Sequence, residues 1–140
     1  MKAKSAIAKG KLLEEWIVER LRLSGLDTRA YRQKGSGSGL NKGDIWNDLN
    51  ICFEAKNQAN FSPAWFKQAE RESMGTQEPV VVWHPQNKPM EDSKVFMNWD
   101  YYEKLLVKSK EPVLNKPTNE LKWRLDSLKS AIQRVIKELQ

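Results

Sequence analysis

The sequence has few cysteines and histidines, the residues that form disulfides and zinc sites in small domains. Its 140 residues include one cysteine, Cys52, and one histidine, His84. An intrachain disulfide is therefore excluded and a Cys/His zinc site is not expected. A lone cysteine suits a reducing compartment. No apolar run reaches 18 residues, so we expect no membrane span, and the basic N-terminus lacks the apolar stretch of a secretory signal. These absences predict a cytoplasmic protein.

Positive charge is abundant, and it is unevenly placed. The chain carries a net charge of +6. Residues 1–43 hold ten Lys or Arg against four Asp or Glu, whereas residues 44–140 hold fourteen of each. An excess confined to one segment favours a polyanionic partner such as nucleic acid. The alternative interpretation is a solvated basic face that keeps the protein soluble.

The spacing of apolar residues predicts helices and strands in alternation. We expect a helix over residues 9–24 that ends at Gly25, a short strand over 28–33 and a flexible Gly/Ser loop over 34–43. A hairpin should follow, with strands 44–46 and 51–56, and then a helix from Ser62 to about Met74. Further elements are an apolar strand over 79–84, a strand over 94–98 and a helix over 100–107. The fold class is therefore α/β (α+β), with a mixed sheet of four to five strands flanked by helices.

The C-terminal segment has a different character. Pro112 and Pro117 indicate a linker. Beyond it, leucine, isoleucine and valine recur at alternating spacings of four and three, at Leu121, Leu125, Leu128, Ile132, Val135 and Leu139. This heptad seam predicts an amphipathic helix over 118–140 that either mediates a homodimer or packs on its own domain. We therefore expect a core over 1–110, and a linker with a helix over 111–140.

The residues with the clearest chemistry lie on the predicted hairpin. Asp44 begins its first strand, and Glu54 and Lys56 share one face of its second strand. Two converging carboxylates are ligands that Mg²⁺ prefers. A lysine beside them can position an attacking water and stabilise negative charge. The pattern predicts hydrolysis of a phosphodiester with Mg²⁺, or with Mn²⁺ as a substitute, and it requires no organic cofactor.

At these residues the chain resembles the PD-(D/E)XK nuclease superfamily, and within it the archaeal-type Holliday junction resolvases. The resemblance covers about residues 9–107. Lys9-Gly10 followed by Glu14 is similar to the N-terminal motif of that family, and Gly43-Asp44-Ile45 and Glu54-Ala55-Lys56 are similar to its acidic and Glu-x-Lys motifs. Lys42-Gly43 stands where the superfamily often has proline. The Asp–Glu spacing is shorter than in many archaeal-type resolvases and closer to that of a phage endonuclease that cuts branched DNA.

The resemblance implies a restriction-endonuclease-like core and a role for each matching residue. Asp44, Glu54 and the carbonyl of Ala55 would bind the metal, and Glu14, or Glu15 beside it, would complete the metal shell. Lys56 would act on the nucleophile and the transition state, and Gln68 would support either Lys56 or the attacking water. The face that carries Glu54 and Lys56 would open toward the DNA. Phosphate contacts are expected from Lys9, Lys11, Arg32, Lys34, Ser36, Ser38 and Lys42.

The expected function is resolution of four-way (Holliday) junctions by a homodimer, since paired symmetric nicks suit a two-fold assembly. Such a protein would act in the cytoplasm of a prokaryotic cell or of a phage-infected host. Two alternatives remain open. One is another nuclease of the superfamily that cuts duplex, flap or nicked DNA. The other is a basic DNA-binding module without catalysis, in which Glu54 and Lys56 form only a cross-strand charge pair.

Overall fold

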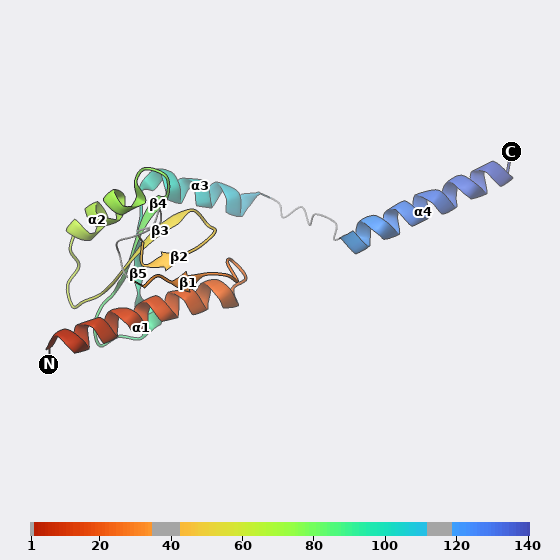
Figure 1. Cartoon of the computed structure of the whole chain (residues 1–140). Coiled ribbons are helices and arrows are strands. Elements are labelled where there is room, and N and C mark those ends of the chain that lie inside the picture. The colour runs from red at the N-terminus through yellow and green to blue at the C-terminus, as the bar shows by residue number, and fades with distance from the viewer. Residues whose placement is uncertain (1, 35–42, 112–118) are drawn as a thin grey trace. The chain divides into compact units, whose positions relative to one another are not determined.

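The computed structural model describes residues 2–34, 43–111 and 119–140, and its helices and strands are arranged as a mixed α/β structure (Figure 1). The chain divides into two units, Met1–Leu105 and Leu106–Gln140. The boundary falls within helix α3 (Trp99–Lys110). No helix in the described ranges is long and apolar enough to cross a membrane.

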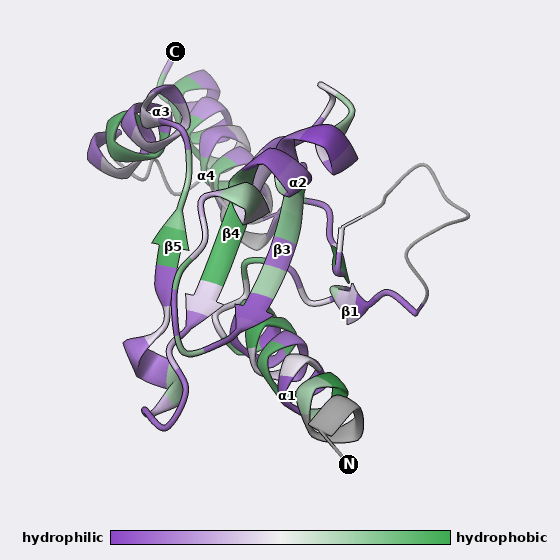
Figure 2. Ribbon diagram, turned by 90° about the vertical axis from the view of Figure 1, so that its left-hand side faces the viewer, coloured by the Kyte–Doolittle hydropathy of each residue, from purple (hydrophilic) through white to green (hydrophobic). Residues whose placement is uncertain are grey.

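The first unit is built on a three-stranded mixed sheet. Strand β4 (Glu78–His84) lies at its centre, parallel to β3 (Ile51–Asn57) and antiparallel to β5 (Lys94–Phe96). Its consecutive valines, Val80 to Val82, are all buried, as expected for a strand covered on both faces. Figure 2 shows β4 as a largely hydrophobic strand between its two neighbours.

Helices cover the sheet on both faces. Helix α1 (Lys2–Leu23) buries Leu13, Ile17 and Leu21 in one core cluster with Phe53 and Val82. Helix α2 (Ala64–Ser73) contacts β3 and β4 and buries Ala69 and Ser73. Since residues alternate along a strand, the opposite face of β3 carries Cys52 and Glu54. The sheet therefore lies between α1 and α2, and the predicted alternation of faces on β3 is confirmed for its apolar residues.

The expected hairpin is wrong. Strand β2 (Ile45–Trp46) pairs with β1 (Tyr31–Arg32) in a separate two-stranded antiparallel sheet, so the described strands form sheets of three and two strands. Between β2 and β3, the side chain of Asn47 replaces the backbone hydrogen bonds of a hairpin. Its amide donates to the carbonyls of Ile45 and Ile51 at 3.1 and 2.8 Å. One backbone bond, from Asp44 N to Phe53 O at 2.8 Å, still joins the two segments.

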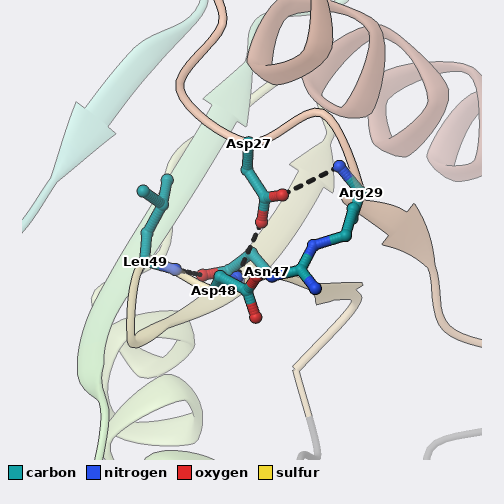
Figure 3. A network of polar contacts seen from close by, with 5 residues as sticks. All are labelled: Asp27, Arg29, Asn47, Asp48 and Leu49. Carbon is teal, nitrogen blue, oxygen red and sulfur yellow. Dashed lines mark hydrogen bonds and ion pairs between the residues drawn. The ribbon is translucent and has the colours of Figure 1, made fainter. Parts of the chain in front are cut away.

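A buried carboxylate anchors the turn after β2 (Figure 3). Asp27 accepts hydrogen bonds from the backbone nitrogens of Arg29, at 2.9 Å, and Asp48, at 2.6 Å. Arg29 also forms an ion pair with the Asp48 side chain. Leu49 N donates to the side-chain oxygen of Asn47 at 3.0 Å. This network joins the segment after α1 to the turn between β2 and β3, and so helps to fix the position of Asp44.

Two helices follow the sheet along the chain. Helix α3 (Trp99–Lys110) begins close to its predicted start and extends three residues further than expected. Helix α4 (Asn119–Glu138) matches the predicted C-terminal helix. At the other end of the chain, Gly25 has a φ of 73°, which is the left-handed conformation predicted for the residue that ends α1.

Candidate active site

The structure brings Asp44 to the backbone of β3 beside the Glu54-Ala55-Lys56 segment. Asp44 Oδ2 accepts a hydrogen bond from Ala55 N at 2.7 Å. Lys56 Nζ lies 2.5 Å from Glu54 Oε1. The three predicted catalytic residues therefore meet although no hairpin joins their strands. The bond from Asp44 N to Phe53 O at 2.8 Å holds Asp44 beside β3.

Burial raises the pKa values of the Asp44 and Glu54 carboxyl groups. The pKa of Asp44 is raised from 3.8 to about 6, first by desolvation, and the nearby Glu14 and Glu72 raise it further. The pKa of Glu54 is raised from 4.5 to about 7, first by burial and then by Asp44. The bond from Ala55 N and the charge of Lys56 act in the opposite direction on Asp44. Two carboxylates held together away from water favour a cation between them.

Lys56 is held by a short polar chain that continues into α2. Its ammonium donates to Gln68 Oε1 at 3.3 Å, and Gln68 Nε2 donates to Glu72 Oε1 at 3.0 Å. Gln68 therefore contacts Lys56, which is one of the two roles that the resemblance implied for it. Sequence reasoning missed Glu72. It lies four residues after Gln68 on the same helix face, and this spacing was the only available signal.

Glu14 and Glu15 have different surroundings. Glu14 Oε2 lies 2.6 Å from Arg32 Nε, with both side chains largely shielded from solvent. Glu15 pairs instead with Lys11 at 3.6 Å on the outside of α1. Glu14 also raises the pKa of Asp44. Of the two glutamates, the structure therefore places Glu14 toward the site, but its nearest partner is an arginine.

The predicted phosphate contacts are scattered. Lys11 and Lys34 are exposed, whereas Arg32 is engaged with Glu14. The carbonyl of Lys9 accepts a hydrogen bond from Asn57 Nδ2 at 3.0 Å, which ties α1 to the end of β3. Ser36, Ser38 and Lys42 lie outside the described residues. The geometry therefore leaves Lys11 and Lys34 as the exposed cations among the predicted residues that the structure describes.

Access to the site differs from the prediction. Glu54 is 3% exposed, because α2 lies over its face of β3, so this face does not open directly to solvent. A groove of about 590 Å³ instead reaches Ala55 and Lys56 from the end of β3. Gly10 of α1 lines it, and a Cβ at Gly10 would meet no other atom. A ligand can therefore approach Lys56 between the N-terminal half of α1 and the end of β3.

Two side chains near the sheet have structural roles. Cys52 is buried, and burial raises the pKa of its thiol to about 12, so it stays protonated. A Cβ at Gly43 would lie 3.2 Å from Cys52 Sγ and 3.0 Å from Phe53 O, which favours glycine before Asp44. His84 is buried at the end of β4, with Nδ1 3.3 Å from Ser93 Oγ.

Within the described ranges, no three His, Cys, Asp or Glu side chains are grouped as a metal site. The donors that do fit a hard cation are the carboxylates of Asp44 and Glu54, whose pKa values are raised first by burial and then by neighbouring carboxylates. The chain matches no protein-family model, and neither curated proteins nor solved structures show a significant match to it.

Proposed function

We propose that the protein is a metal-dependent endodeoxyribonuclease of the PD-(D/E)XK type, with a restriction-endonuclease-like core, and that it cuts branched DNA, foremost four-way junctions. The observation that carries the proposal is the meeting of Asp44, Glu54 and Lys56 in a partly desolvated cluster. The resemblance of the surrounding motifs to archaeal-type resolvases supplies the choice of substrate.

Asp44 and Glu54, with the carbonyl of Ala55, would hold a Mg²⁺ or Mn²⁺ ion. When bound, such an ion polarises a phosphodiester and lowers the pKa of a coordinated water. Binding it requires both carboxylates to ionise, which their raised pKa values oppose below about pH 7. Cleavage should therefore increase with pH from about 6 to 8.

The remaining groups act on the phosphate and the attacking water. Lys56 now neutralises Glu54, and a cation in the site would free its ammonium to orient water and stabilise the developing negative charge. Gln68 keeps Lys56 on that side through its hydrogen bond. Arg32 offsets the charge of Glu14, and on binding it would exchange that partner for a DNA phosphate.

Cleavage of a labelled synthetic four-way junction in Mg²⁺ tests the activity. Asp44→Asn and Glu54→Gln should each lower the rate by at least about 100-fold and leave junction binding within a few-fold. Glu15→Gln is the matched control, because Glu15 is exposed and paired with Lys11; it should cut normally. Equal cutting by all the variants would refute the site.

The choice of substrate is tested separately. The wild-type protein is offered a junction, a flap, a nicked duplex and a linear duplex of matched sequence. Preference for the junction is expected. Equal cutting of linear duplex would indicate a duplex nuclease, and salt-sensitive binding without product in Mg²⁺ or Mn²⁺ would indicate a binding module without catalysis.

A further inference from the structure

The apolar side chains of helix α4 are exposed to solvent in the part of the chain that the structure describes. Leu125, Leu128, Ile132 and Val135 are between 49% and 60% exposed. In proteins, the 20 residues of such a helix draw most of their stability from packing and not from helix propensity. Amphipathic helices gain most of their stability by burying such a face against a partner. The helix therefore requires a second apolar surface.

The flanks of this face restrict what the partner can be. The spacings of three and four residues place the apolar side chains in the a and d positions of a heptad. Arg124, Ala131 and Glu138 then line one flank of the seam. Lys122, Lys129 and Ile136 line the other flank. The first flank changes from basic to acidic along the helix, with a small residue between its charges.

We propose that α4 pairs with α4 of a second copy of this chain in an antiparallel orientation, with the two-fold axis beside Ala131. In this register Leu125 packs against Val135 of the partner subunit, and Leu128 packs against Ile132 of the partner subunit. Arg124 faces Glu138 of the partner subunit, and the symmetry repeats this attraction at the other end. Ala131 allows close approach of the two helices at the axis.

Charge selects this orientation over the parallel one. In a parallel pair Arg124 would face Lys129 of the partner subunit twice, with no compensating attraction. The antiparallel pair has two attractive contacts between flanks and a single contact between like charges, where Lys129 meets its own copy. The helix is therefore complementary to itself in one direction only. That self-complementarity favours a second copy over an unrelated partner.

The oligomeric state of the full-length chain tests the pairing. Sedimentation of the wild-type protein at micromolar concentrations should give a dimer. The double variant Leu128→Lys/Ile132→Lys should be monomeric, with a dissociation constant raised at least about 100-fold. Ser127→Lys/Ser130→Lys adds the same two charges outside the seam and should remain dimeric. A monomeric wild type, including one in which α4 packs on its own core, would overturn the proposal.

Single cysteines in a Cys52→Ala background test the direction. Residues 124 and 138 lie about 21 Å apart along a helix. In the antiparallel pair a short bis-maleimide should therefore join Ala131→Cys to its own copy, and join Arg124→Cys to Glu138→Cys in a mixture of the two variants. Cross-linking of Glu138→Cys to its own copy would demonstrate parallel helices and refute the orientation. None of these readouts depends on nuclease activity.

Charge reversal gives a second test of direction. Glu138→Arg should weaken the dimer by placing two arginines opposite each other, and adding Arg124→Glu should restore it. Restoration to within about three-fold of the wild-type dissociation constant is expected. If the double variant is as weak as the single one, Arg124 and Glu138 do not face each other.

Discussion

The two units of this protein depart from the usual partition of polar and apolar residues in opposite directions. The first unit buries polar and charged side chains, among them Asp27, Asn47 and Glu54, whereas α4 exposes leucine, isoleucine and valine. Every buried side-chain nitrogen or oxygen atom in the described residues has a hydrogen-bond partner. The departure in the first unit is therefore balanced inside the fold, and the departure in α4 calls for a partner from outside its unit.

Equivalent truncations in the two units should have very different costs, and this is the largest effect that we expect. Leu13 is fully buried in the core cluster, whereas Leu128 is 60% exposed. Leu13→Ala should lower the free energy of unfolding by about 3 to 4 kcal/mol. Leu128→Ala should lower that of the first unit by less than about 0.5 kcal/mol and weaken the dimer instead. Urea denaturation followed by tryptophan fluorescence, with sedimentation in parallel, measures both; equal losses would contradict the comparison.

Periodicity predicted the parts of the fold that depend on local pattern. The apolar spacings of α1 and α4, the valine run of β4 and the left-handed Gly25 all follow from neighbouring residues. The pairing of β2 could not be predicted in the same way. Asn47 makes four hydrogen bonds to the backbone around the turn, and it replaces a ladder that the alternating pattern alone would favour.

The candidate site was predictable where its residues follow one strand. Glu54 and Lys56 share a face by alternation, and their side chains do meet. The burial of Glu54 was not predictable, because it depends on where α2 crosses the sheet. The pairing of Glu14 with Arg32 joins residues 18 apart through the packing of α1 on β1. Glu72 enters the site only because α2 faces β3.

The free energy of unfolding of the first unit should depend on pH because it buries Asp44 and Glu54, whereas the described side chains of α4 include no buried carboxylate of this kind. The pKa values of Asp44 and Glu54 are raised on folding. Their contribution to stability is therefore complete below about pH 4, where both are protonated in either state, and is lost as the pH rises through 6 to 7. Because Glu54 is almost wholly buried whereas solvent reaches Asp44, we expect a loss of about 3 kcal/mol, most of it from Glu54, between pH 4 and 8 in metal-free buffer.

The double variant Asp44→Asn/Glu54→Gln provides the control for this loss, because neither of its side chains titrates there. It should be more stable than the wild type at pH 8 and close to it at pH 4. Urea denaturation at both pH values measures the difference. A wild type and a variant with parallel pH profiles would show that the two carboxylates are not strained in the folded state.

Removing the buried anchor of the turn should have a smaller effect. Asp27 accepts two backbone hydrogen bonds, from Arg29 and Asp48. Asp27→Ala should cost about 1 to 2 kcal/mol in unfolding free energy, because it leaves those nitrogens without their partner. Asp48→Ala removes only the exposed ion pair with Arg29 and should cost less than about 0.5 kcal/mol. Thermal denaturation of both variants gives the comparison, and similar losses would show that Asp27 is not the anchor.

The smallest effect on stability is expected at Lys11, on the exposed side of α1. Its ion pair with Glu15 at 3.6 Å joins two exposed side chains, and such a pair contributes less than about 0.5 kcal/mol. Lys11→Gln should therefore leave unfolding nearly unchanged. If Lys11 contacts a DNA phosphate, however, the slope of log binding constant against log salt should become shallower by about 1. Lys122→Gln on α4 removes the same charge from the other unit and should leave the slope unchanged. Titration of a labelled junction at several salt concentrations measures the slopes, and an equal change in both variants would show that net charge, and not a contact at α1, governs binding.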